Sequence, residues 1–452
     1  MSPKHFPVIA LAILLVVVAA GIAFYRASHR SAAPSALSTR ETTSASSSPI
    51  DLALTPLGGN EPIDSEIAEF QKQIRGSRTP NPLLERLGWA FVTKARLTND
   101  PGFYKLAEQC AAAVAQSDPA DPEADLLRGH IDHALHRFHD AEAIARKLVA
   151  TREFVFDYAL LGDALMEQGK LTEAVPAYQK MVDLKPCLQT YSRIAHMRWL
   201  KGDLAGAIAA GRLAVSSGSP REPEPLAWAA TRLGFYLLQQ DELSAALTSA
   251  DEAVHYAPNY AAALLLKGRV LLAQGKAAEA VAQLEKAAAS SPLPDYLWTL
   301  AEAFRANGDT AKAAETEQKL TATGAANDPR TLSLYLASRG TNAVEAVRLA
   351  RAELIERTDV FTHDAVAWAE LANGNPAVAQ AESQKALAEG TTDTRLLYHA
   401  GVISAAAGRP LEAIAHLEQA KAHSGTLLPS ERADLSTKLA SVDRGTANLT
   451  LR

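Results

Sequence analysis

The chain has 452 residues, of which 48% are hydrophobic, 21% charged and 6% aromatic, and its formal net charge is −6. This composition is typical of a folded protein and excludes wholesale disorder and collagen. Two cysteines exclude a disulfide-dense scaffold and a four-cysteine zinc site, and the weakly acidic balance argues against nucleic acid as a partner. Alanine is abundant, so we expect a core of small side chains at close helix contacts.

A membrane span is predicted at the N-terminus. After a short tail, residues 1–5, no charged side chain occurs from Phe6 to Tyr25. A helix of this length crosses the roughly 30 Å core of a bilayer, so we predict a signal anchor. A cleaved signal peptide is the alternative, because small residues near Ala20 suit cleavage. We expect a single-pass protein of the inner membrane, with its N-terminal tail in the cytoplasm and its body outside.

Residues 26–59 are predicted to be a flexible linker. They are rich in Ser, Thr, Ala and Pro. Such a stretch buries too little apolar surface to offset the entropy lost on ordering. We expect it to hold the body away from the membrane.

One repeating pattern dominates the remainder of the chain. Apolar residues follow the helical period, and a turn such as Gly169-Lys170 separates two helices, since glycine adopts the left-handed conformation that ends a helix. A single hairpin of this kind cannot bury its apolar face, so neighbours must stack. A small residue recurs in each unit and a second follows twelve positions later: Gly129 and Ala141, Gly162 and Ala174, Ala195 and Ala207, Gly234 and Ala246, Gly268 and Ala280, Ala301 and Ala313, and Gly401 and Ala413.

This pattern resembles the tetratricopeptide repeat (TPR) family. Residues 156–186 match the family pattern at five positions: Tyr158, Gly162, Ala174, Tyr178 and Pro186. The resemblance implies an all-α fold, a right-handed α-solenoid of about ten helical hairpins over residues 60–428. The units begin near residues 81, 122, 155, 188, 227, 261, 294, 327, 360 and 394.

One unit departs from the regular pattern, and a further helix is predicted before and after the ten units. The unit from 327 is degenerate, with Thr341 at the position of the turn glycine. Residues 62–76 are predicted to add a leading helix. Residues 429–452 are predicted to form a capping helix and tail, with Ser430 as the N-cap residue.

No catalytic or cofactor-binding domain is expected. The anchor, linker and repeats leave no stretch of about 100 residues for a separate catalytic domain. Sequence patterns for phosphate loops, nucleophile elbows, zinc proteases and dinucleotide binding are absent. We therefore predict that the protein is not an enzyme and holds no cofactor, and that Cys110 is a small core residue.

Four histidines at intervals of three, His130, His133, His136 and His139, raise the alternative of a metal site. Each step of three residues drifts about 60° around a helix, so the four cannot face one ion, and the last two straddle the predicted turn. A two-histidine site at His130 and His133 with a carboxylate from Asp163 or Glu167 remains an alternative to histidines that bind no metal.

The TPR resemblance also implies which residues face the concave side. In the register fixed by the small residues, all five tryptophans fall on first-helix positions that form this side in the family. Tryptophan and arginine are enriched at binding hot spots, while burial of the same residues in the core is the alternative. The inner-face set comprises Trp89, His130, His133, Asp163, Glu167, His196, Trp199, Trp228, Phe235, Arg269, Trp298, Glu302, Arg305 and Trp368, with Phe361, Arg395 and Tyr398 on the same side.

The predicted function is that of a membrane-tethered scaffold for protein–protein interactions. We expect a partner's extended peptide or helix to bind in the concave groove. Similarity to bacterial single-span TPR proteins implies a role in envelope assembly or in maturation of exported proteins. A metal-handling protein or metalloenzyme using His130 and His133, and a structural module that self-associates, are the alternatives. The sequence leaves the oligomeric state open.

Overall fold

The computed structural model describes residues 48–98 and 100–450. All regular secondary structure in these ranges is helical, which confirms the all-α prediction for this part of the chain. Among the described helices, none combines the length and the apolar character needed to cross a bilayer. The predicted anchor, Phe6–Tyr25, and residues 26–47 of the predicted linker lie outside the described residues.

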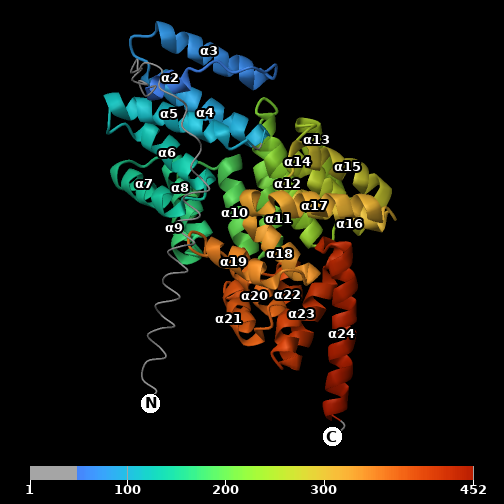
Figure 1. Ribbon diagram of the computed structural model, residues 1–452. Coiled ribbons are helices and arrows are strands. Elements are labelled where there is room, and N and C mark those ends of the chain that lie inside the picture. Colours follow the sequence, from blue (N-terminus) through green and yellow to red (C-terminus); the bar gives the residue numbers. More distant parts are fainter. Residues whose placement is uncertain (1–47, 99, 451–452) are drawn as a thin grey trace, which may run out of the picture. The chain divides into compact units, whose positions relative to one another are not determined.

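Most helices pair with their neighbour in the chain (Figure 1). The helices α2 (Pro49–Ala53) and α3 (Pro62–Gly76) precede the pairs, and α3 lies at the position of the expected leading helix. The helices η1 (Ser424–Thr426) and α24 (Pro429–Thr450) follow the pairs. The described residues therefore hold more helices than ten hairpins provide. The pairs are α4 (Asn81–Thr98) with α5 (Gly102–Ser117), α6 (Pro122–Ala134) with α7 (Phe138–Thr151), α8 (Val155–Glu167) with α9 (Leu171–Leu184), α10 (Leu188–Leu200) with α11 (Leu204–Ser216), α12 (Pro223–Gln239) with α13 (Leu243–Tyr256), α14 (Ala261–Ala273) with α15 (Ala277–Ser290), α16 (Pro294–Ala306) with α17 (Thr310–Asn327), α18 (Pro329–Arg339) with α19 (Ala343–Glu353), α20 (Val360–Ala372) with α21 (Pro376–Leu387), and α22 (Thr394–Ala406) with α23 (Pro410–Ala422).

The turns within the hairpins use left-handed backbone, as the glycine pattern predicted. Gly169 has φ 67°, and His136 (φ 61°) and Asp241 (φ 62°) adopt the same conformation in turns that lack glycine. In the degenerate unit the turn glycine is Gly340 (φ 62°), one residue before Thr341, because α18 is a short helix that ends at Arg339.

The recurrent small residues lie where paired helices touch. A Cβ added at Gly162 would overlap the ring of Tyr178 on the partner helix, and one at Gly268 would overlap Leu284. Close-packed interiors leave no room for such atoms. Seven alanines at the second recurrent position have no exposed surface: Ala141, Ala174, Ala207, Ala246, Ala280, Ala313 and Ala413.

The first helices of neighbouring repeats pack against one another, as α12 does with α14 and α20 with α22, whereas neighbouring second helices are farther apart. The first helices therefore form the inner side of the array. Late repeats also contact early ones: Thr358 Oγ1 donates to the carbonyl of Gln168 at 2.6 Å, and Gln239 Nε2 donates to Asp393 Oδ2 at 2.6 Å. These contacts cover part of the inner side, so the inner side is not open along its whole length.

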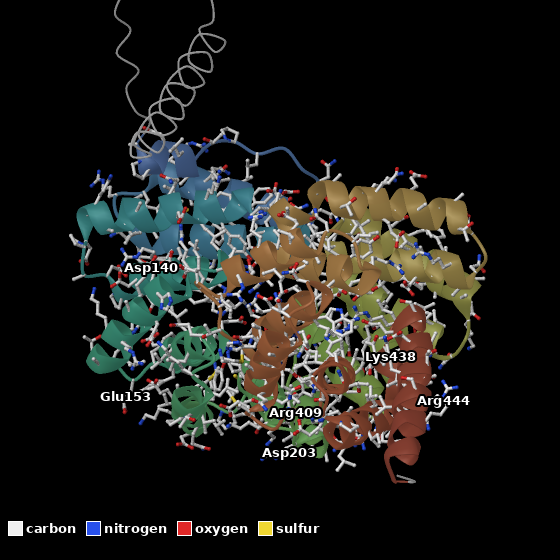
Figure 2. All side chains as sticks on the ribbon, turned by 60° about the horizontal axis from the view of Figure 1, so that its bottom comes forward. Asp140, Glu153, Asp203, Arg409, Lys438 and Arg444 are labelled. Atoms are coloured by element: carbon white, nitrogen blue, oxygen red, sulfur yellow. The ribbon has the colours of Figure 1, made fainter. Side chains whose placement is uncertain are left out.

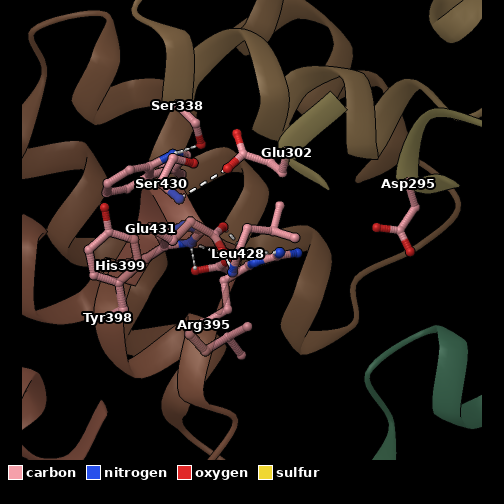
Figure 3. Close-up of polar contacts among 12 residues, drawn as sticks. Asp295, Glu302, Ser338, Arg395, Tyr398, His399, Leu428, Ser430 and Glu431 are labelled. Carbon is pink, nitrogen blue, oxygen red and sulfur yellow. Dashed lines mark hydrogen bonds and ion pairs between the residues drawn. The ribbon is translucent and has the colours of Figure 1, made fainter. Parts of the chain in front are cut away.

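The last helix, α24, is fixed to earlier repeats at its N-terminus (Figure 3). Glu431 accepts from the Leu428 amide at 2.8 Å and pairs with Arg395 at 2.9 Å, while the Ser430 amide donates to Glu302 at 3.0 Å. The predicted N-cap role of Ser430 is wrong, because the helix already begins at Pro429. The Glu431 carboxylate accepts from the amide of Leu428, the residue before the helix.

The end of the predicted linker is ordered against the repeats, which corrects its boundary. Ser48 caps α2, and the buried Gln71 side chain donates to the carbonyls of Ala53 and Thr55 at 3.0 and 2.9 Å. Ala53 is fully buried. The apolar residues within 50–57 supply the surface that holds this segment, packed beside the core of α3, α4 and α5.

Charged side chains lie on the outer surface (Figure 2). Asp140, Glu153, Asp203, Arg409 and Arg444 are all exposed. Charged side chains of both signs on an outer face keep a repeat array solvated.

Candidate functional site

A cavity of about 740 Å³ lies on the inner side, between α8–α14 and the segment from Arg357 to Glu389. We call it the central cavity. Its volume lies within the range of sites that hold small organic ligands. Six members of the inner-face set line it: Glu167, His196, Trp199, Trp228, Phe235 and Arg269. Further lining residues are Arg232, Tyr260, Asp295, Arg330, Arg357, Asp359, Phe361, His363, Lys385 and Glu389.

Aromatic rings form one wall of the central cavity. Trp199 is only 3% exposed, stacks on Phe361 with ring centroids 5.4 Å apart, and meets Phe235 edge-on at 5.2 Å. Trp228 and Phe235 are half-buried. These two rings therefore keep surface that a bound molecule could cover, while Trp199 belongs mainly to the core.

Most charges around the central cavity are paired. Arg269 pairs with Asp295, and Arg330 pairs with Asp359 at 3.0 Å. Arg357 lies between Glu167 and Asp359. Burial raises the pKa of the Asp359 carboxyl, but the two nearby guanidinium groups outweigh it and hold that pKa below its usual range. The pair between Arg357 and Glu167 connects the late segment 357–359 to the early repeats.

Arg232 differs from the other arginines of the central cavity. Its Nη2 donates to His196 Nδ1 at 2.8 Å and contacts Tyr236 Oη at 3.3 Å. Its guanidinium lies 5.7 Å from the Trp199 ring centroid and 5.2 Å from that of Phe235, within cation–π range. Within the described residues, no carboxylate lies at ion-pair distance from it.

His196 is uncharged at neutral pH. Burial, and then the adjacent Arg232 charge, lower its pKa to about 3. Arginine has only hydrogen-bond donors, so the neutral imidazole must accept through Nδ1 and carry its proton on Nε2. The ring thus presents a donor, not an acceptor, on its other side.

Two further tryptophans of the inner-face set meet in a second cavity of about 280 Å³. Trp298 is 2% exposed and Trp368 8%. Trp368 stacks on His399 at 4.0 Å and donates to Ser338 Oγ at 2.9 Å, while Trp298 meets Tyr335 edge-on. For these residues and for Trp199, the core alternative holds, because late repeats cover the positions that the TPR register places on the inner side.

Glu302 and Arg305 belong to an ion network and not to an open binding face. Glu302 is 2% exposed and accepts from Arg339 at 2.8 Å. Arg305 pairs with Glu317, which also binds Arg339. The buried Glu302 carboxylate, paired with Arg339, also accepts from the Ser430 amide and so links this repeat to α24.

The remaining inner-face residues lie near the start of the array. Trp89 is half-buried, with its ring 5.1 Å from that of His130. Asp163 is occupied by Arg193, at 2.6 Å, and by the Tyr178 hydroxyl, at 2.8 Å. This cluster is separate from the central cavity.

The histidine run does not form a metal centre in the described part of the chain, where no three His, Cys, Asp or Glu side chains come together as ligands. His130 and His133 lie on α6, His136 in the turn and His139 on α7. The carboxylates that could have joined them, Asp163 and Glu167, pair with arginines. Both cysteines are free thiols, and Cys110 is fully buried as predicted.

Several residues of the central cavity could not be predicted from the sequence pattern. Arg232 lies on α12 and Tyr260 immediately before α14, and neither was singled out, while Arg330, Arg357 and Lys385 come from late repeats. The repeat register gives no signal for Arg357, because it reaches the cavity through a contact between segments more than 100 residues apart.

Comparison with known proteins identifies the repeats. Residues 159–223, 231–294 and 267–329 match the sequence profile of a family described as tetratricopeptide repeat. Two crystal structures of MamA share 22% identity, cover 36% and 37% of this chain and 92% and 89% of theirs, and give TM-scores of 0.30. The human IFIT1 dimer with PPP-AAAA shares 14% identity, covers 82% of this chain and 93% of its own, and gives a TM-score of 0.45. No curated protein matches the chain in sequence.

Proposed function

We propose that this chain, whose residues 159–223 and 231–329 match the tetratricopeptide-repeat family, is a scaffold that binds a segment of a partner protein. Its proposed role is to bind, not to catalyse a reaction. Repeat arrays of this kind present extended inner surfaces to partners.

The central cavity is the observation that carries this proposal. Trp228 and Phe235 are half-buried there, next to the arginines of the cavity. Aromatic anchors beside arginine are the usual composition of a binding hot spot. The contacts of the late repeats narrow the available surface to this cavity, so the partner inserts a short peptide or one turn of a helix and does not lie along a continuous groove.

We further propose that the scaffold is attached to the inner membrane through Phe6–Tyr25, with the repeats outside the cytoplasm. The uncharged stretch of sequence supports an anchor. A role in envelope assembly or in maturation of exported proteins fits that location. Protease treatment of intact spheroplasts tests it: the repeats should be digested, and protection until lysis would place them on the cytoplasmic side.

Site-specific photocrosslinking tests partner binding. A photoreactive phenylalanine analogue replaces Trp228 in one full-length variant and Leu411, which is 75% exposed on the outer side, in a matched control. Illumination of native membranes should give a discrete adduct from position 228 only. Equal adducts from both positions, or none from 228, would contradict the proposal, and an adduct between two copies of this chain would favour the self-association alternative.

A further inference from the structure

We infer that the central cavity binds an anionic group, a carboxylate or a phosphate, attached to an apolar body. The inference rests on the proposed function in placing a ligand in this cavity, but it names the chemistry of that ligand. It follows from an excess of positive charge and of unsatisfied hydrogen-bond donors around the cavity.

The charge excess comes from Arg232. The other arginines of the cavity have carboxylate partners, and the lining residues Lys385 and Glu389 pair with Glu382 and Lys201. Only Arg232 among the lining cations lacks a carboxylate within the described residues. A half-buried guanidinium is costly to leave unpaired, and this one lies in a chain whose net charge is −6. A bound anion would supply the missing charge.

The unsatisfied polar groups at the cavity are mainly donors. The Trp199 indole N–H and the Arg269 Nε–H are buried without an acceptor in the described structure. The neutral His196 ring carries its proton on Nε2, because Nδ1 accepts from Arg232. The one unsatisfied acceptor, Glu167 Oε2, already faces the Arg357 guanidinium. A carboxylate or phosphate, which has several acceptor oxygens, matches such a donor-rich surface.

The rest of the cavity calls for an apolar body. At about 740 Å³ it is far larger than a bare anion needs. Trp228, Phe235 and Tyr260 are half-buried around it, and Leu265 and Leu266 add aliphatic surface. The favoured ligand therefore joins an anionic group to an aromatic or aliphatic portion, as an acidic residue flanked by apolar ones does, or as a free aryl carboxylate or phosphate does.

Isothermal titration of the full chain with small probes tests the inference. 3-Phenylpropionate and phenyl phosphate should bind, and the neutral 3-phenylpropanamide should bind at least tenfold more weakly. Affinity for the two anions should fall as salt concentration rises. Equal binding of the amide, or no binding of any anionic probe, would overturn the inference.

Substitution of the cation locates the site. Arg232→Gln should weaken binding of the anionic probes at least tenfold, and Arg232→Lys should restore part of it. The matched control is Arg198→Gln on α10, an exposed arginine paired with Asp203 at 2.8 Å and absent from the cavity lining. Arg232 has no ion pair in the described structure but donates to His196 and Tyr236, so circular dichroism must show that the helical content of each variant is unchanged. Unchanged anion affinity in both Arg232 variants would overturn the assignment.

Two further probes separate the sources of the anion. The capped peptide Phe-Asp-Phe is compared with Phe-Asn-Phe, and both are compared with the free anions. Preference for the aspartate peptide supports a protein source, and binding of the free anions alone supports a small molecule. If photocrosslinking at position 228 captures a partner but the cavity shows no preference for anions, only this inference is overturned. If the cavity binds anions but position 228 captures no partner, only the scaffold proposal is overturned.

Discussion

At the scale of single residues, the fold depends on glycines at the contacts between paired helices. Gly162 packs directly against Tyr178, whose hydroxyl donates to Asp163 within the same pair of helices. The Tyr178 side chain is 1% exposed and has no room to retreat. One additional methyl group at this contact must therefore displace the Tyr178 ring or the helix that carries it.

We predict that Gly162→Ala lowers the free energy of unfolding by about 1–3 kcal/mol, the usual cost of overpacking, even though alanine favours helix over glycine. Gly76→Ala, at the end of α3 where an added Cβ meets nothing within 4 Å, is the control and should change stability by less than about 0.5 kcal/mol. Urea unfolding followed by circular dichroism measures both. Equal effects would mean that the contact at Gly162 is loose.

Two half-buried histidines, His130 and His196, make stability dependent on pH. Burial lowers the pKa values of both His130 and His196 to about 3. The unfolded chain binds protons at these rings near pH 6.5 and the folded chain does not, so stability falls as the pH drops below about 6.5.

Between pH 7 and pH 5 we expect a loss of at most about 2 kcal/mol for each ring, less where the ring is partly exposed. Glu85, whose pKa burial raises to about 7, acts in the opposite direction, so the comparison must be made with a variant. The double variant His130→Gln/His196→Gln should lose less stability on acidification than the wild type. Parallel pH profiles of the unfolding free energy would contradict this expectation.

At the scale of elements, α24 does more than cover the end of the array. Glu431 is 4% exposed and holds both the start of this helix and Arg395 of α22. Glu302 of α16 binds the Ser430 amide from the other side. The helix therefore joins two repeats that are not neighbours in the chain.

We predict that Glu431→Ala costs about 3 kcal/mol or more, because it leaves a largely buried Arg395 without its partner. The control Glu418→Ala removes a surface pair with Lys421 at 3.9 Å and should cost less than about 0.5 kcal/mol. The difference between the two unfolding free energies is the measurement, and a difference below about 1 kcal/mol would show that α24 contributes little to the stability of the repeats.

At the scale of the whole described array, contacts between distant repeats distinguish this protein from an open solenoid. In an open array each repeat touches only its neighbours. Here the Thr358 hydroxyl binds the Gln168 carbonyl, and Lys201 pairs with Glu389 at 2.7 Å. Early and late repeats should therefore not open independently.

Hydrogen exchange tests this coupling. Thr358→Ala removes one hydrogen bond, worth about 1 kcal/mol, and should make amides of the α8–α9 turn exchange about fivefold faster. Thr248→Ala removes a hydroxyl that is exposed and bonded only within its own helix, to Ser244, and should leave exchange in that turn unchanged. Unaltered exchange in the Thr358 variant would indicate that the distant contact does not restrain the early repeats.

The repeats themselves could be predicted from sequence because their signals are local. Gly162 and Ala174 recur in equivalent form along the chain, and the turn at Gly169 is decided by its immediate neighbours. Which residues of the inner side are buried could not be predicted in the same way. Trp298 occupies an inner-face position in the register and is nevertheless buried, because the segments that cover it lie far along the chain.

The candidate site illustrates the same limit. Trp228 was singled out by its residue type and position, but Arg232, one helical turn away, was not. The distinction of Arg232 is that no carboxylate of the described structure reaches it, and that property depends on where every acidic side chain lies in three dimensions. A local periodicity carries no such information.

The bond between Thr358 and Gln168 has a consequence for how such a chain can evolve. Open arrays lengthen by duplication of a unit, since an added hairpin needs only two compatible neighbours. Here a hairpin gained or lost between α10 and α19 would carry Thr358 away from Gln168 and uncover the Trp199 ring that Phe361 now covers. The number of hairpins between these residues is therefore fixed by geometry, and lineages of this protein should diverge by substitution and not by changes in copy number.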